Sequence, residues 1–400
     1  MPADIPTLYK RIAAAASFEG ADAAIRIHAE YEPIGGPTDK ISPPTYPVGD
    51  DKTPPYLLED RYGPDGEVEH TVLLDSRQSQ ANRCEEALQS AIDAGEVSIP
   101  HLSLETIAHG RTIRITSLQA PHRSRDAYYR DSETADGTRF DDTSVGALLK
   151  GVTPEDATPL YRHAPTDLVY GVWDSHRKLR LAPRFPRVYT SEIVGYGVQA
   201  GRRAAGRSDL IVSGAKRVMP TDEGSFALGD GKGSKKLSEM GHGSIPPGET
   251  VTRNRQTVLT PGGVTVRRID RHASLGFAGL ARVAFGDSLT REGARAARAA
   301  LACVALAGDR LAFGRPAVFL RSGCELLLID EQMAWIGRGN RDGDDLELSP
   351  DEAVELVTHA IGRALDADAN WSGDIVTVRP HAALQDVIEE SFFAVPSEEE

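Results

Sequence analysis

The stretch Leu74–Arg83 reads LDSRQSQANR and leads into a segment with helical periodicity. Small and apolar residues recur every three or four positions up to Ala91, which predicts a helix over 79–91. The free backbone N–H groups of a helix N-terminus favour anions. The polar side chains near this terminus are Ser76, Gln78, Ser79, Asn82 and Arg83. They suit contacts with phosphates and sugars; the alternative is that Asp75 and Ser76 form a cap and the amides are solvated.

Two more helices are predicted further along the chain. One covers 290–307, where Ala is dense. The other begins at Pro350, with Ser349 as N-cap and two acidic residues in the first turn, where the helix dipole favours anions. Turn residues predict hairpins between 250–259 and 264–271, and between 317–320 and 325–329. Helices and hairpins without regular alternation indicate an α+β fold.

Two segments are expected to be insertions. Residues 33–56 are rich in Pro and Gly and should be extended. Residues 221–249 contain seven glycines with Lys232, Lys235 and Lys236, and they should form a mobile loop that either closes over a ligand or is a disordered insertion. We therefore expect a core over 1–340 with these insertions. An acidic C-terminal region over 341–400 should add one helix packed on the core and a disordered tail.

Charge is distributed unevenly along the chain. The formal net charge is -14, yet the region from Arg177 to Arg217 has ten cations, opposed only by Glu192 and Asp209. Residues 341–400 contain sixteen acidic residues and three Arg, a net of -13, so the other 340 residues are close to neutral. Clustered cations repel one another unless an anion neutralises them, which points to phosphate. The alternative is pairing with the acidic C-terminal region.

Several classes of protein are disfavoured by the composition. No apolar run approaches the roughly 20 residues that a membrane span requires, and the N-terminus lacks the pattern of a secretory signal. Three widely spaced cysteines suggest neither a disulfide framework nor a zinc cluster. We expect a cytoplasmic protein without a metal or other cofactor.

A second group of candidates surrounds residues 122–131. His122, Arg123 and Arg125 are cationic, although a structural role for His122 is favoured over RNA contact because no His or Cys lies at ligand spacing. Asp126 and Asp131 could hold a metal ion for phosphodiester cleavage, but each follows an Arg, so salt bridges are expected instead. If these residues did hold a metal ion, the protein would be a metal-dependent ribonuclease, which is the alternative to simple binding.

Trp173 and the arginines that follow it complete the candidates. Trp173 could stack on a base, but its apolar neighbours favour a place in the core. Five guanidinium groups within 24 residues cannot all pair with Glu192 and Asp209. They are Arg184, Arg187, Arg202, Arg203 and Arg207.

Six sequence blocks resemble blocks of a known family and occur in the same order as in that family. They are IGGPTDK with PPTY (34–40 and 43–46), LDSRQSQANR (74–83), APHR (120–123), YRDS (129–132), GVWDS (171–175) and GRR (201–203). Together they resemble the CRISPR-associated RAMP backbone subunit of type I-U (I-G) Cascade, of the Cas-seven group. The resemblance covers roughly residues 30–215, and it adds Lys40 of the first block to the candidate RNA-binding residues.

The resemblance implies a fold and a role. It implies a palm similar to an RNA-recognition motif (ferredoxin-like), with long finger and thumb insertions. It also implies a non-catalytic ribonucleoprotein subunit for antiviral defence. Its partners would be CRISPR RNA (crRNA), target DNA paired to that RNA, further copies in a helical filament and other Cascade subunits. A protein-only assembly factor, whose basic stretch docks on an acidic tail, is a third hypothesis.

Overall fold

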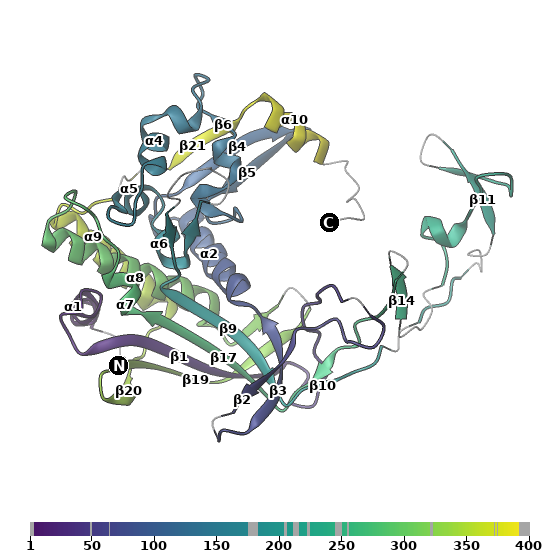
Figure 1. Cartoon of the computed structure of the whole chain (residues 1–400), viewed down its shortest axis with the longest axis horizontal. Helices are drawn as coiled ribbons and strands as arrows, with labels where there is room; N and C mark the ends of the chain where they lie inside the picture. The colour runs from purple at the N-terminus through teal and green to yellow at the C-terminus, as the bar shows by residue number, and fades with distance from the viewer. Residues whose placement is uncertain are drawn as a thin grey trace.

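The computed structural model is a mixed α+β fold, which confirms the expected class (Figure 1). The described residues are 4–48, 50–63, 65–174, 183–203, 206–210, 216–221, 225–244, 250–253, 256–320, 323–371, 373 and 375–391. A main sheet with helices on one face, a smaller sheet and a projecting arm make up the chain (Figure 1). Among the helices of the described residues, none has both the length and the apolar character of a membrane span.

The main sheet is antiparallel at every pairing between its strands. In the order of hydrogen-bonded neighbours, its strands are β18 (Ala317–Phe319), β19 (Glu325–Gly337), β1 (Asp22–Pro33), β17 (Arg268–Gly276), β9 (Tyr189–Tyr196), β3 (Val68–Asp75) and β2 (Leu58–Tyr62), and β20 (Asn340–Asp345) pairs with β19. Alternate residues of β1 and β17, such as Ile27 and its register partner Ala273, are buried beneath the helices. The sheet therefore has one core face and one open face.

Helices cover the core face. They are α1 (Ile5–Ala15), α2 (Arg77–Asp93), α6 (Thr166–Tyr170), α7 (Phe277–Ala281), α8 (Arg291–Phe313) and α9 (Pro350–Asp366). α8 is the central helix because its small residues let neighbours approach closely. A Cβ added at Gly308 would lie 3.2 Å from atoms of Cys84 and Leu88, so glycine allows α2 to pack against α8 at this point.

A network of buried charges connects α8 to the sheet. Arg271 of β17 is fully buried and forms an ion pair with Asp309 of α8, and it donates to the Tyr189 hydroxyl at 2.8 Å. Arg310 pairs with both Asp309 and Glu331 of β19. Arg271 and Arg310 hold the pKa of Asp309 at about 2, against the opposing effect of burial. These arginines stabilise the body and have no access to a surface ligand.

A smaller sheet lies beside the helices and contains the C-terminal elements. Its strands are β5 (Arg111–Thr116), β4 (Leu102–Ala108), β21 (Val376–Pro380) and β6 (Ser132–Glu133), and α10 (Ala382–Ser391) packs against it. The sequence predicted one helix after residue 341, whereas the structure has α9, β21 and α10. β21 is missed because it is only five residues long and pairs in parallel with β4, far away in the sequence. The expected disordered tail, Glu398–Glu400, is outside the described residues.

Short elements connect the two sheets. They are η1 (Arg123–Arg125), α3 (Ala127–Arg130), η2 (Phe140–Asp142), α4 (Ser144–Lys150), α5 (Thr158–His163), β7 (Val172–Trp173) and β8 (Arg184–Phe185). η1 contacts β7, and β7 pairs with β8. This region therefore brings the sequence blocks 120–123 and 171–175 together.

The arm, which we define as residues 199–265, extends away from the body (Figure 1). Its elements are β10 (Gln199–Ala200), β11 (Arg217–Pro220), β12 (Phe226–Leu228), β13 (Lys235–Lys236), η3 (Leu237–Met240), β14 (Thr250–Arg253), β15 (Gln256–Leu259) and β16 (Val264–Thr265). Within the expected mobile loop 221–249, β12 and β13 pair with β11. Part of this loop is therefore a small sheet. Backbone pairing between its strands forms the sheet, and a glycine-rich sequence does not reveal such pairing.

The predicted helices are confirmed and one of the two hairpins is wrong. α2 covers the predicted segment, α8 continues six residues beyond 307, and Ser349 caps α9 in a capping box with Glu352. β18 and β19 form the second hairpin. In the first, β14 pairs with β15 inside 250–259, while β17 pairs with β1 and β9, because the core requires its apolar face. In the segment 33–56, predicted to be extended, Pro33 ends β1 and Ile41 forms a β-bridge with Val264, and the other described residues lie outside helices and strands.

Candidate nucleic-acid interface

The N-terminus of α2 offers exposed amides beside a fixed cap. Ser76 is the N-cap, and its hydroxyl accepts from the backbone N–H of Ser79 at 3.2 Å. Gln78 and Asn82 are exposed, whereas Ser76 and Ser79 are half-buried. The capping alternative therefore accounts for Ser76, while the two amides can reach a ligand.

Arg83 connects this helix to the edge of the main sheet. Its Nε donates to Asp75 Oδ2 at 2.7 Å, and its Nη1 donates to the Phe319 carbonyl of β18 at 3.0 Å. Asp75 also accepts a hydrogen bond from Gln80. These contacts fix Arg83 to the body, so its side chain positions α2 against β18 rather than extending into solvent.

The base of the arm brings two distant sequence blocks together. Lys40 is exposed, and its Nζ donates to the Arg202 carbonyl at 3.4 Å. A Cβ added at Gly262 would lie 2.2 Å from the Gly201 carbonyl oxygen, so the backbones meet without side chains between them. The N–H of Gly263, whose φ is +73°, donates to the Tyr56 hydroxyl at 2.7 Å. Tyr56 and this turn hold the arm in place, a role the sequence did not suggest because Pro261-Gly262-Gly263 indicated only a hairpin turn.

Hydrogen bonds and strand pairing connect the arm to α2. The Arg202 carbonyl is bound by Lys40, and the N–H of Ile34, six residues before Lys40, donates to the Glu325 carbonyl of β19 at 3.0 Å. β19 pairs with β18, which accepts the hydrogen bond from Arg83 of α2. The sequence blocks 34–46, 74–83 and 201–203 are therefore neighbours in the fold.

Arg123 and Arg125, predicted to bind RNA, are buried. The Arg123 guanidinium donates to both carboxylate oxygens of Glu85 at 2.6 and 2.7 Å, and to the Gly171 carbonyl at 2.9 Å. Arg125 donates to the Leu149 carbonyl at 2.5 Å and lies 3.8 Å from Asp174. This part of the prediction is wrong, because a cationic cluster in a sequence does not reveal that the fold supplies internal acceptors.

The proposed nuclease residues are not gathered into a metal site. Asp126 caps α3 by accepting from the N–H of Tyr128, and its other oxygen accepts from the N–H of His122 at 3.0 Å. Asp131 pairs with Arg130 at 2.6 Å, as expected, and the hydrogen bond from Arg130 lowers the pKa of Asp131. The His122 side chain is exposed. Both carboxylates therefore have structural partners.

Trp173 lies on the surface, contrary to its expected place in the core. Its exposed fraction is 54%, and the Arg184 guanidinium carbon lies 5.9 Å from its ring centroid. Arg184 is exposed and Arg187 half-buried. Burial, and next the charge of Arg123, lower the pKa of Arg187, and its Nε is buried with no hydrogen-bond partner. Trp173 and Arg184 form an exposed aromatic and cationic pair suited to a stacked base or phosphate.

The arm presents cations to solvent. Arg202, Arg207, Lys232, Lys235 and Lys236 are exposed and Arg203 is half-buried. Glu192 is one of the two anions in the basic stretch, but it pairs with two arginines from elsewhere in the chain, Arg61 at 2.8 Å and Arg77 at 3.3 Å. The cations Arg177, Lys178 and Arg180 lie outside the described residues.

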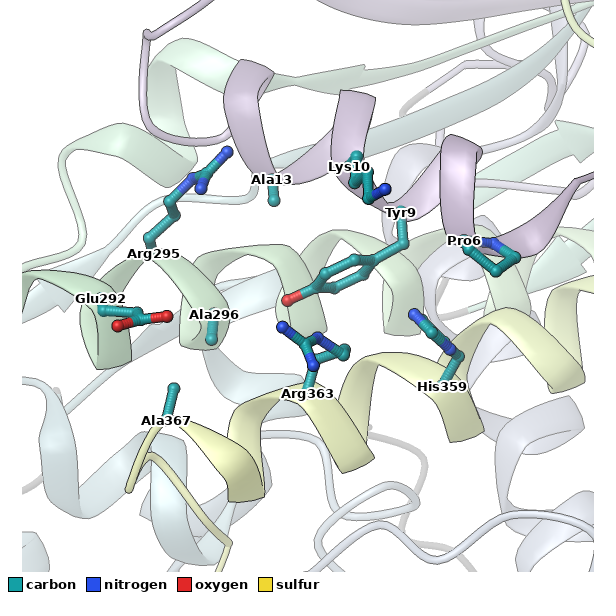
Figure 2. A pocket seen from close by; sticks show the side chains of 10 residues that line it. All are labelled: Pro6, Tyr9, Lys10, Ala13, Glu292, Arg295, Ala296, His359, Arg363 and Ala367. Atoms are coloured by element: carbon teal, nitrogen blue, oxygen red, sulfur yellow. The ribbon is translucent and has the colours of Figure 1, made fainter.

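A pocket of about 670 Å³ lies elsewhere, between α1, α8 and α9 (Figure 2). Tyr9 extends from α1 toward Arg363 and His359 of α9, and Arg295 of α8 lies across the pocket (Figure 2). The Tyr9 and His359 rings meet edge to face at 5.1 Å. Arginine and lysine around a small apolar floor suit an anionic group. None of the candidate RNA-binding residues lines this pocket.

The comparisons with known proteins agree with the sequence blocks. Residues 25–200 match the model of a family described as CRISPR-associated protein GSU0053. The match includes β1, β2, β3, α2 and β9 of the body, and it ends where the arm begins. A search of curated proteins finds no match. The match over residues 25–200 supports a CRISPR-associated protein with a role in CRISPR defence.

Proposed function

We propose that this chain is the RNA-binding backbone subunit of a type I Cascade complex of the I-U (I-G) type. In this role it polymerises along the spacer of a CRISPR RNA and presents the RNA for pairing with target DNA. The main sheet with its helices would be the RNA-recognition-motif-like palm, and the arm a finger or thumb. The family match at residues 25–200 supports the CRISPR context of this proposal.

The observation that carries the proposal is that exposed amides and cations stand on α2 and on the arm, two elements that contacts through β18 and β19 connect. Gln78 and Asn82 lie on α2, Arg202 and Arg207 lie on the arm, and Lys40 contacts Arg202. Cations and amides of this kind grip phosphates and sugars without reading bases, which a filament must do if it accepts any spacer. Trp173 adds an aromatic surface that every base can stack on.

The arm also supports self-assembly. It exposes apolar side chains: Leu228 of β12 is exposed at 76%, and Leu210, outside its strands, at 94%. A ribbon this thin cannot bury them against its own residues. Contact with the next copy along the RNA would cover these side chains, and other Cascade subunits would bind at the ends of the filament.

Copurification of nucleic acid tests the proposal. The full chain is expressed with and without a CRISPR array and purified at moderate salt, and bound RNA is sequenced. We expect spacer-containing CRISPR RNA when the array is present. Recovery of protein without RNA, or of RNA with no enrichment of array transcripts, would reject the RNA-binding role and favour the protein-only assembly factor.

The proposal includes the absence of strand cleavage. Asp126 and Asp131 serve as cap and ion-pair partner, which leaves no pair of carboxylates for two metal ions among these candidates. Purified protein with CRISPR RNA and a matched DNA or RNA target should give no products with magnesium or manganese. Products that disappear in Asp126→Ala or Asp131→Ala would establish the ribonuclease instead.

A further inference from the structure

The open face of the main sheet gathers two histidines and an aspartate. His28 of β1 and His272 of β17 are register partners, so their side chains project to the same side. Their rings stack with centroids 5.3 Å apart. Asp270 lies two residues before His272 and shares this face because strand side chains alternate. One potential ligand atom from each residue lies within 4.8 Å of the others.

The carboxylate of Asp270 is buried and only partly satisfied. Its Oδ2 accepts from Arg268 Nε at 2.7 Å and lies 3.8 Å from His28 Nε2 and 4.0 Å from His272 Nε2. Its Oδ1 is buried and has no hydrogen-bond partner. A buried acceptor without a partner is destabilising, so this oxygen indicates a missing ligand beside the two imidazoles.

We propose that His28, Asp270 and His272 bind a divalent transition-metal ion such as Zn²⁺. Two imidazole nitrogens and one carboxylate oxygen form a common set for zinc, with a fourth position open to water. Ligand atoms of a tetrahedral zinc site lie about 3.3 Å apart, given bonds of about 2.0 Å. One ligand atom of each residue lies within 4.8 Å of the others, so side-chain rotations can bring the three groups to these distances. Both histidines are nearly half exposed, at 44% and 45%, so an ion can enter from solvent.

The surrounding groups orient the ligands. The Tyr196 hydroxyl lies 3.0 Å from His272 Nε2, so it must turn away when that nitrogen binds an ion. Arg268 stacks on Tyr196 at 4.3 Å and holds Oδ2, which leaves Oδ1 for the ion.

Other charges face the same site. Glu30 lies opposite Asp270 in the register and Glu192 opposite His272, and Arg61 pairs with Glu192. With Arg268, these neighbours carry two negative and two positive charges, so they add no net charge to the site.

Calorimetric titration of the full-length protein with ZnCl₂ tests this site directly. We expect one zinc ion per chain in a chelator-treated sample, and a visible absorption band when Co²⁺ is used instead. His28→Gln with His272→Gln should abolish both signals. Because the two side chains are nearly half exposed, this variant should fold, which its metal-free thermal melting curve checks.

A matched control comes from another histidine on the same sheet. His70 of β3 lies 2.7 Å from Asp60 of β2. This pair is not part of the group formed by His28, Asp270 and His272. His70→Gln should leave zinc binding unchanged. Tyr196→Phe, which removes a hydroxyl that competes with the ion for His272 Nε2, should not weaken it. Zinc binding that is absent from the wild type, or equally strong in the double His variant, would overturn the proposal. Neither result depends on RNA binding.

Discussion

Arginines of the body and arginines of the arm have opposite environments. In the body, Arg123 and Arg271 are buried and bind carboxylates within the fold. In the arm, Arg202 and Arg207 are exposed and lie outside its strands. The sequence presents all of them as clustered cations. The difference teaches that a cationic cluster predicts a binding surface only where the fold leaves the cations exposed to solvent.

The largest expected effect is on stability, at a body arginine. Arg123→Met leaves Glu85 buried without its bidentate partner, which should lower the free energy of unfolding by about 3 to 5 kcal/mol. Urea unfolding measures this change. Adding Glu85→Gln should recover part of the loss, since the uncompensated charge is removed. An unchanged midpoint would place Arg123 among the surface cations and break the comparison.

Acid should reveal the second buried pair. The folded-state pKa of Asp309 is about 2, below its ordinary value of 3.8, so the folded state holds fewer protons than the unfolded state as pH falls. Its contribution, about 2 kcal/mol, is complete above pH 4 and is lost between about pH 4 and 2. Urea unfolding at pH 5 and pH 3 should show a smaller loss in Asp309→Asn than in wild type. Equal losses would mean that Arg271 and Arg310 do not hold this carboxylate ionised.

Part of this molecule was predictable from local sequence. The helices α2, α8 and α9 have periodicity and caps that act over a few residues, and the β18–β19 hairpin has a turn between its strands. β21 was not predictable in this way, because it pairs with a strand far away in the sequence. The same holds for β17, which leaves the expected hairpin to complete the main sheet.

The candidate site also has residues whose environment was predictable from local sequence and residues whose environment was not. Exposure of Gln78 and Asn82 follows from helical periodicity, because the apolar face of α2 is fixed by its own residues. The burial of Arg123 depends on Glu85, 38 positions away, and on the Gly171 carbonyl. Trp173 was expected in the core from its apolar neighbours, yet the β7–β8 pairing turns it outward. Tertiary partners decide these positions.

The smallest expected effect is at Trp173. Trp173→Ala should weaken RNA binding by about 1 kcal/mol, at the lower end for loss of one stacked base, and leave the fold unchanged because the side chain is exposed. Fluorescence anisotropy with labelled RNA measures the affinity. Trp173→Phe, which keeps an aromatic face, is the matched variant and should recover most of the binding. A fall in thermal stability with no change in affinity would return Trp173 to a structural role.

The central claim, that the exposed cations of the arm bind RNA, is tested most directly by charge reversal. Arg202→Glu with Arg203→Glu is compared with wild type and with Arg282→Glu and Arg291→Glu, two exposed arginines on the α7–α8 side of the body. Affinity for CRISPR RNA is measured across a salt series. We expect a loss of about tenfold or more in the arm variant, similar for all spacers, and a salt slope smaller by about 0.7 for each lost phosphate contact. The control pair should bind like wild type. Unchanged affinity and slope in the arm variant would contradict the claim.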